Sequence, residues 1–492
     1  MSQSYILAID QGTSSTKTLI FEEAGQAVAR GSEPLQTNYL DNGWVEQDAE
    51  TIFRNVIASV KKCLEQFRAK GFDIKDIRTI GISNQRETFV VWDRDGIALH
   101  PAIVWQCKRS VAICEELKQQ GHASIIRQKT GLVIDPYFSA TKLVWLFQNN
   151  GRVKKAIQSG DAFFGTIDCW LLYRLTKGKE FATDYTNASR TLFFNLHTLS
   201  WDSDLVELFG VSGVHLPAIK ASAALFGETD LEGIFDRKLP ITAMIGDSHA
   251  AAFGEGCFDT GTAKATLGTG CSILMNIGEQ PVTSRHGMVT TICWSTEERI
   301  DFALEGVIVS CGATIEWLKN EMKLFDDPRE TASMANSVAD NGGVYLVPAF
   351  SGLGSPHWQM ERRASISGLS FGSTKNHVVR AALESIPFQV KDVIAAMERD
   401  AGIQLVELYA NGGMTSNSFV MQLLADLLNI PVSSGTMADV SALGAAYLAG
   451  IKAGVYEGID ALRKLAVAKK YYSPIQPSVA SQAYKGWLKA LK

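Results

Sequence analysis

A pattern of strand, Gly-Thr turn and strand occurs twice in this chain of 492 residues, and it limits the fold more than any other feature. The first copy covers residues 5–21 and turns at Gly12-Thr13, and the second covers residues 264–275 and turns at Gly268-Thr269. Continuous apolar runs of this length are typical of buried strands. Each copy therefore predicts a β-hairpin, and we interpret the chain as a two-fold internal repeat.

Helical patterns alternate with the strands. Apolar residues fall at helical spacing from residue 49 to residue 70, and strands are expected at 79–83 and 89–92. This alternation predicts an α/β fold. A helix of small residues at 442–446 would let another backbone segment approach closely. The other expected elements are helices at 110–119, 313–322, 377–399 and 418–429 and a strand at 408–411.

The length of the chain predicts two domains with a cleft between them, because single hydrophobic cores stop growing at about 250–300 residues. We place the boundary after residue 254, which gives an N-terminal domain of residues 1–254 and a C-terminal domain of residues 255–492.

Composition excludes several classes of protein. The net charge is −5 without a long block of one sign, which argues against a nucleic-acid partner. No run of about eighteen apolar residues could span a membrane, and the first residues lack the pattern of a signal peptide. The eight cysteines form no CxxC pair, which favours reduced thiols in the cytoplasm over a zinc site or a disulfide framework.

The first turn combines a carboxylate, Asp10, with glycine and hydroxyl groups at residues 12–15. Such a turn can hold phosphate with backbone N–H groups and hydroxyls, while the carboxylate can hold a metal-bound water. An ordinary hairpin turn is the alternative. Two Gly-Thr turns in one chain, with Gly412-Gly413 before a late helix, favour a phosphate clamp, although neither a P-loop nor a dinucleotide-binding glycine motif is present.

Further polar residues follow apolar strands. Arg86 and Glu87 could form a surface ion pair, or could bind hydroxyl groups by donating and accepting hydrogen bonds. Asp247 ends an apolar run and could take a proton from a substrate hydroxyl; a metal site with His249 is the less favoured alternative. Trp105 and Tyr137 could be core residues or the walls of a pocket.

Two longer segments make the chain similar to a known family. Residues 138–149 and 364–384 match the two signatures of the FGGY carbohydrate kinases, and shorter stretches resemble the glycerol kinase branch of that family. The resemblance extends from about residue 5 to residue 490. The shorter stretches are AIDQGTSS, ISNQRET, AIVWQCKR, TGLVIDPYFSATK, TDYTNASRTLFFNLHTL, ALEGVIV and SALGAAYLAG.

The resemblance implies two ribonuclease H-like domains of the actin and hexokinase type around an interdomain cleft that holds ATP and Mg²⁺. It implies transfer of the γ-phosphoryl group to a terminal hydroxyl of a small polyol, with Asp247 as catalytic base and Asp10 associated with the metal. It assigns the acceptor site, in the N-terminal domain, to Arg86, Glu87, Trp105, Tyr137, Asp247 and Ser248. It assigns ATP binding to Thr13, Ser14, Ser15, Lys17, Thr269, Gly312, Glu316, Gly413, Met414 and Asn417. A homodimer or homotetramer is compatible with it.

The chain departs from the glycerol kinase pattern at several positions. Ser248-His249 replace a Gln-Gln pair, Glu316 replaces a glutamine, and Lys17 stands where arginine is more frequent. Residues 231–235 lack the loop associated with inhibition by fructose bisphosphate, so we do not expect that regulation. Glycerol is therefore the first expected acceptor and glycerol 3-phosphate the product. Another polyol or a ketose, such as erythritol or xylulose, is the alternative, and a non-enzymatic ATP-binding scaffold is the least favoured interpretation.

Overall fold

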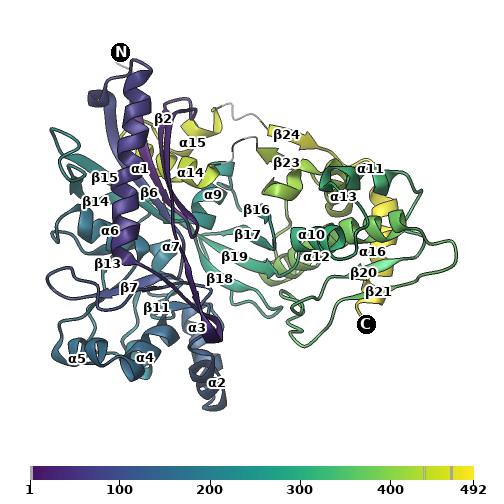
Figure 1. Ribbon diagram of the computed structural model, residues 1–492, viewed down its shortest axis with the longest axis horizontal. Helices are drawn as coiled ribbons and strands as arrows, with labels where there is room; N and C mark the ends of the chain where they lie inside the picture. The colour runs from purple at the N-terminus through teal and green to yellow at the C-terminus, as the bar shows by residue number, and fades with distance from the viewer. Residues whose placement is uncertain (1–3, 436, 438, 466–468) are drawn as a thin grey trace.

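Two mixed sheets, one from each half of the chain, organise the fold (Figure 1). The computed structural model describes residues 4–435, 437, 439–465 and 469–492. The first half of the chain forms the lobe on the left of Figure 1, and most of the second half forms the lobe on the right.

The sheet of the first half has the strand order β14-β15-β6-β1-β2-β3. β1 pairs antiparallel with β2 and β2 with β3, whereas β6 lies parallel to β1 and β15 lies parallel to β6. Every residue of β1 is buried, which agrees with its continuous apolar sequence. The strands are β1 (Tyr5–Gln11), β2 (Ser15–Glu22), β3 (Ala27–Pro34), β6 (Ile77–Asn84), β14 (Ala223–Thr229) and β15 (Leu239–Gly246).

The sheet of the second half repeats this arrangement in the order β18-β19-β17-β16-β22-β23-β24. β16 and β17 form the second antiparallel hairpin, and β22 and β23 lie parallel to β16. The predicted internal repeat is confirmed, because each hairpin has two parallel strands on one side and an antiparallel strand on the other. The strands are β16 (Thr262–Leu267), β17 (Cys271–Gly278), β18 (Val289–Ser295), β19 (Ile300–Ile308), β22 (Glu407–Asn411), β23 (Val432–Gly435) and β24 (Lys469–Tyr472).

One helix of the second half packs on the sheet of the first half. α1 (Ala49–Ala69) covers one face of that sheet, and α14 (Val440–Lys452) covers the other face together with α9 (Asp247–Glu255). A Cβ atom on Gly444 would lie 1.8 Å from the Ala250 carbonyl oxygen, so only glycine allows α14 and α9 to cross this closely. The predicted close approach of the small-residue helix is confirmed.

A smaller five-stranded sheet, in the order β4-β5-β8-β7-β9, extends the left lobe. It packs with helices α2–α5 around a separate apolar core that includes Phe138 and Leu143. The strands are β4 (Asn38–Leu40), β5 (Trp44–Gln47), β7 (Phe89–Trp92), β8 (Ala102–Ile103) and β9 (Phe163–Thr166). The helices of this lobe are α2 (Val111–Gln119), α3 (Ala123–Thr130), α4 (Ser139–Asn149), α5 (Gly151–Ser159), α6 (Ile167–Leu175), α7 (Tyr185–Ala188) and α8 (Ser203–Leu208), and its short strands are β10 (Ala182–Asp184), β11 (Phe194–Asn195), β12 (Ser200–Trp201) and β13 (Ala218–Lys220).

The right lobe has its core between its sheet and a long helix, α12 (Lys375–Ala401). Thr374 and His377 form a capping box at the start of α12, and Gly402 ends it in a left-handed conformation with a φ of 67°. The remaining elements are α10 (Gly312–Asn320), α11 (Thr331–Asn336), α13 (Ser418–Leu428), α15 (Ile459–Arg463), α16 (Pro477–Ala490), β20 (Tyr345–Val347), β21 (Ser365–Ser367) and the short 3-10 helices at Asp41–Gly43, Ile74–Asp76, Pro328–Glu330 and Gly413–Ser416.

The elements expected from the sequence are present, with ends that differ by a few residues. The helix expected at 49–70 is α1, the strand expected at 89–92 is β7, and the α/β class is confirmed. No helix in the described part of the chain is long and apolar enough to cross a membrane. All eight cysteines are buried, and none forms a disulfide.

Candidate active site

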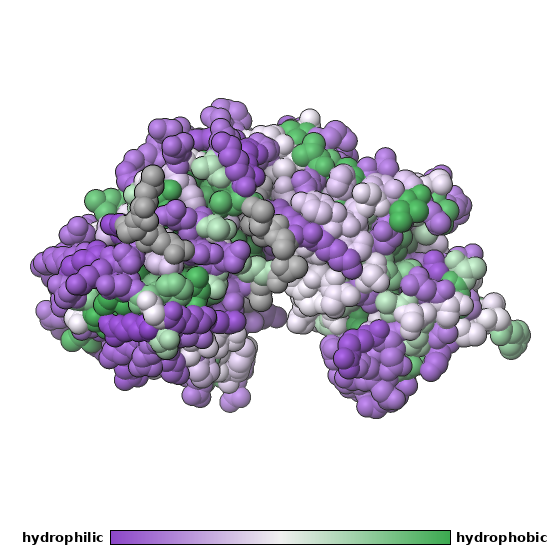
Figure 2. Space-filling view, turned by 90° about the horizontal axis from the view of Figure 1, so that it is seen from above, coloured by the Kyte–Doolittle hydropathy of each residue, from purple (hydrophilic) through white to green (hydrophobic). Residues whose placement is uncertain are grey.

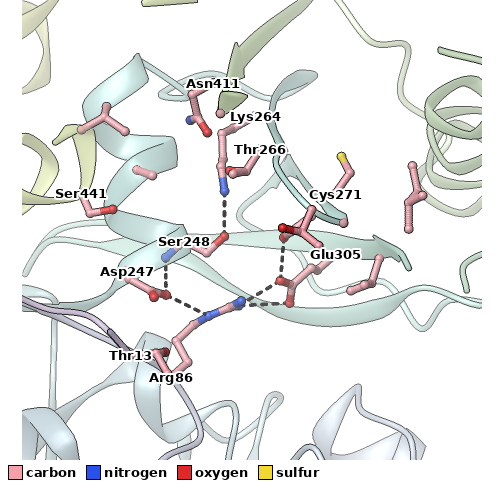
Figure 3. Close-up of a pocket in the computed structure, with 18 of the residues that line it drawn as sticks. Thr13, Arg86, Asp247, Ser248, Lys264, Thr266, Cys271, Glu305, Asn411 and Ser441 are labelled. Carbon is pink, nitrogen blue, oxygen red and sulfur yellow. Dashed lines mark hydrogen bonds and ion pairs between the residues drawn. The ribbon is translucent and has the colours of Figure 1, made fainter. Parts of the chain in front are cut away.

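A cavity of about 1120 Å³ lies between the two lobes and is lined by residues of both (Figure 3). The surface is also deeply notched between the lobes when the molecule is seen from above (Figure 2). Both Gly-Thr turns reach the cavity, through Thr13 and Thr269. The expected cleft between two halves of the chain is therefore present, and both predicted phosphate turns border it.

At one end of the cavity, five charged side chains alternate in sign. The Arg86 guanidinium lies 3.4 Å from Asp247 Oδ1 and 3.0 Å from Glu305 Oε1. Arg190 in turn lies 2.7 Å from Glu305 Oε2 and 2.6 Å from Glu87 Oε1. We call Asp247, Arg86, Glu305, Arg190 and Glu87 the charge network. Glu305 belongs to β19 of the right lobe and the other four belong to the first half of the chain, so the network connects the lobes.

The parallel strands of the first sheet bring three members of this network together, namely Arg86, Glu87 and Asp247. β6 ends at Asn84 and β15 ends at Gly246, so the residues that follow them meet at the same edge of the sheet. Asp247 is also the first residue of α9, where the helix dipole favours a negative charge. Glu87 has a φ of 60°, a left-handed conformation that is rare outside glycine and is found at functional sites.

Burial and the neighbouring charges together determine the charge states of Glu305 and of the adjacent His249. Burial opposes the ionisation of Glu305, but Arg190 and Arg86 outweigh it and hold the pKa of this carboxyl well below its usual range. The neighbouring His249 is fully buried, and neither of its ring nitrogens has a hydrogen-bond partner among the described residues. Burial and the adjacent Arg86 lower the pKa of His249 well below its usual value, so its ring is neutral. Its side chain is not part of the cavity wall.

Two aromatic rings form a wall beside the network. Trp105 and Tyr137 line the cavity with ring centroids 5.5 Å apart, and the indole N–H of Trp105 donates to Thr13 Oγ1 at 3.0 Å. The buried ammonium group of Lys142 donates to the carbonyl oxygens of Pro136 and Tyr137 at 2.8 Å each, which fixes the loop that carries Tyr137. Burial lowers the pKa of Lys142 to about 8.

The other end of the cavity is built from backbone turns. The Gly268 N–H donates to the Gly270 carbonyl at 2.9 Å, and the Gly312 N–H donates to the Gly268 carbonyl at 2.9 Å. Gly412 has a φ of 94°, and a Cβ there would lie 2.6 Å from the Leu267 carbonyl oxygen, so this turn requires glycine. Gly413 also lines the cavity, next to Gly412.

The structure separates the residues assigned by resemblance into two groups. Those that line the cavity are Thr13, Arg86, Glu87, Trp105, Tyr137, Asp247, Ser248, Thr269 and Gly413. Those that lie outside its lining are Asp10, Ser14, Ser15, Lys17, Gly312, Glu316, Met414 and Asn417. In the second group, Lys17 pairs with Asp439 at 3.0 Å and Asn417 caps α13. Asp10 accepts a hydrogen bond from Ser83 at 2.7 Å, and burial raises its pKa to about 6.

Three charged residues at the site were not predicted from the sequence: Glu305, Arg190 and Lys264. Glu305 and Lys264 lie inside the buried strands β19 and β16 and are 2 % and 1 % exposed. A charged residue within an otherwise apolar strand was the available signal, because a buried charge is costly unless a partner compensates it.

Known proteins match the chain along almost its whole length. The profile of the FGGY family of carbohydrate kinases matches residues 5–254 with its N-terminal domain and residues 263–453 with its C-terminal domain. A glycerol kinase of Bacillus cereus (strain Q1) is 42% identical over 490 residues, which cover 99% of this chain and 98% of that protein. The crystal structure of Plasmodium falciparum glycerol kinase with ADP has a TM-score of 0.94 and 36% identity, and covers 99% of this chain and 98% of that one. A gluconate kinase from Lactobacillus acidophilus has a TM-score of 0.88 and 25% identity, and covers 99% of this chain and 96% of that one.

Proposed function

The chain belongs to the FGGY family of carbohydrate kinases, and on this basis we propose that it transfers the γ-phosphoryl group of ATP to a terminal hydroxyl of glycerol. The observation that carries the proposal is the composition of a single cavity. A carboxylate, a pair of buried polar side chains and two Gly-Thr turns all face the same space. Phosphoryl transfer needs an acceptor in line with a bound triphosphate, and the cavity offers separate ends for the two.

Asp247 is the proposed proton acceptor. Its carboxylate lies 3.4 Å from Arg86 Nε and accepts a hydrogen bond from the Ser248 N–H at 2.6 Å, which fixes its direction. The side chain remains 37% exposed toward the cavity, so a hydroxyl group can reach it. A carboxylate held in this way can take the hydroxyl proton as the oxygen attacks phosphorus.

Arg86 and Glu87 are proposed to bind the remaining hydroxyl groups. Arg86 can donate and Glu87 can accept, and both are largely buried, so their hydrogen bonds to a polyol compete little with water. Trp105 and Tyr137 would pack against the carbon chain. The acceptor would then be fixed with one oxygen next to Asp247.

The Gly-Thr turns at Thr13 and Thr269 are proposed to hold the phosphates of ATP, with the other residues assigned by resemblance around them. Asp10 fits a magnesium site, because it is a buried carboxylate with one hydroxyl partner and with Asp247 and Asp439 nearby. Among the described residues no group of three or more metal-ligating side chains occurs. When bound, Mg²⁺ would neutralise phosphate charge.

We further propose that residues 1–254 and 255–492 are the two domains and that they close on the substrates, which would exclude water from the reaction. The buried free thiols favour a cytoplasmic location. A homodimer or homotetramer remains an expectation from the resemblance.

A second acceptor class is favoured by one observation. Ser248 lines the cavity with a short side chain, and its hydroxyl accepts a hydrogen bond from Lys264 at 2.8 Å. The space that a longer residue would fill remains part of the cavity, so a longer polyol or a ketose could also bind.

The test is ATP-dependent ADP release with Mg²⁺ and a panel of glycerol, erythritol, D-xylulose, L-ribulose and gluconate, with a control that lacks acceptor. We expect the highest kcat/KM for glycerol. With Ser248→Gln, we expect the preference for glycerol over erythritol to rise by about 1–3 kcal/mol, since the amide would complete the hydrogen bonds of a short polyol. If the wild-type protein prefers a ketose, the acceptor belongs to the second class and the proposal of glycerol is wrong. If no acceptor is phosphorylated, the proposed kinase activity is contradicted.

A further inference from the structure

Lys264 is a buried cation that faces the cavity and forms no ion pair within the described part of the chain. It is 1 % exposed and lies in the middle of β16, yet it forms part of the cavity wall. Its ammonium group donates to Ser248 Oγ at 2.8 Å (Figure 3), and no carboxylate among the described residues lies within 4.0 Å of it. Burial lowers its pKa and Arg86 acts in the same direction, while the more distant carboxylates Glu305 and Asp247 oppose the shift without reversing it.

The other cationic side chain in the described cavity wall, Arg86, lies between Asp247 and Glu305 and is neutralised by them. A cation that is taken out of water without a partner costs several kcal/mol, so an unpaired buried ammonium indicates that an anionic ligand completes its environment.

The position of Lys264 indicates which anionic group of the ligand the ammonium would contact. Lys264 and Thr266 are two residues apart on β16, both face the cavity, and the strand leads directly into the turn that carries Thr269. The partner of Lys264, Ser248, is the residue after Asp247. The ammonium group therefore contacts the residue that follows the proposed base, and it comes from the strand that leads into the proposed phosphate turn.

We propose that Lys264 is a catalytic residue that contacts the transferred phosphoryl group, an inference that rests on the proposed function. The acceptor oxygen forms a bond to the γ-phosphorus, the bond from that phosphorus to the bridging oxygen breaks, and ADP leaves with the electron pair. The acceptor proton goes to Asp247. Lys264 exchanges no proton and compensates the charge on the equatorial oxygens during transfer.

The test compares Lys264→Met, which keeps the length and removes the charge, with Lys264→Arg. We expect Lys264→Met to lower kcat by about 100-fold or more, as loss of one charge-stabilising donor does in other enzymes, and Lys264→Arg to retain more activity. A non-hydrolysable ATP analogue should lose more affinity than ADP in Lys264→Met, because only the analogue carries the γ-phosphoryl group. Ethylammonium should restore part of the activity of Lys264→Ala.

Two results would overturn the proposal. One is a kcat of Lys264→Met within threefold of wild type. The other is an equal loss of affinity for the analogue and for ADP without rescue by the amine, which would assign Lys264 a structural role. The thermal midpoint of each variant reports whether the fold is retained. If wild type phosphorylates no acceptor, the proposed function fails, but the comparison of analogue with ADP still tests the contact.

Discussion

Glu305→Gln tests whether the charge network holds the two lobes and the acceptor site together. The side chain of Glu305 is 1% exposed and faces guanidinium groups of Arg86 and Arg190 at 3.0 and 2.7 Å. Removing one partner of a buried ion pair costs about 3–5 kcal/mol. In Glu305→Gln, Arg86 still pairs with Asp247 and Arg190 still pairs with Glu87. We therefore expect a cost at the lower end of this range, about 3 kcal/mol. The glutamine N–H₂ group would also face a guanidinium donor, so one hydrogen bond is lost.

The assay is calorimetric unfolding together with acceptor kinetics. For a lobe of roughly 250 residues, a loss of 1 kcal/mol in the free energy of unfolding lowers the thermal midpoint by about 2–4 °C. We therefore expect the midpoint of Glu305→Gln to fall by about 6–12 °C, and we expect its KM for the acceptor to rise. Glu384→Gln is the matched control, because Glu384 is also buried but, among the described residues, forms an ion pair with one arginine, Arg380, outside the cavity. The control should lower the midpoint less and leave the KM unchanged.

The pH dependence gives an independent check. Since the pKa of Glu305 in the folded protein lies below its ordinary value of 4.5, its stabilisation is complete above that pH and is lost only as the pH falls further. The difference between wild type and Glu305→Gln should therefore stay constant from pH 8 to about pH 5. A midpoint within 2 °C of wild type with an unchanged KM would refute the role of Glu305 as a connection between the lobes.

Two further predictions concern single side chains at the site. Asp247→Asn should lower kcat by about 10²–10⁴-fold because the proton acceptor is lost, while ADP binding measured by calorimetry changes little; near-native turnover would remove Asp247 from this role. Lys142 has a folded pKa of about 8, below the ordinary value of 10.5, so between these values the unfolded chain binds the extra proton and stability should rise with pH. Relative to Lys142→Met, wild type should gain up to about 1.4 kcal/mol per pH unit in the free energy of unfolding above pH 8, and a difference that does not change with pH would contradict the shift.

The local sequence was sufficient to predict the helices and strands of the fold and part of the candidate site. The apolar run of β1 and the turn at Gly12-Thr13 have local causes, and the hairpin repeats at β16 and β17 for the same reasons. Arg86 and Asp247 could be placed at strand ends because polar residues directly follow apolar strands there. These features can be predicted because they depend only on residues that are close together in the sequence.

The rest depends on contacts between distant segments. Glu305 meets Arg86 only because the two lobes face each other, and Lys17 pairs with a residue 422 positions away, Asp439. A lysine within a strand, such as Lys264, could equally have pointed to solvent on an edge strand. The packing of α14 on the first sheet also has no local signal beyond its small residues.

The return of α14 to the first lobe has a consequence for how the protein is made. Ile6 and Phe21 of the first sheet pack in one core with Leu443 and Leu448 of α14. During synthesis, α14 cannot cover its part of this face until residues 440–452 have left the ribosome, so we expect the first lobe to finish folding only after that point. A fragment that ends at residue 254 would lack α14 and would leave its part of this apolar face open to water, so we expect such a fragment to self-associate.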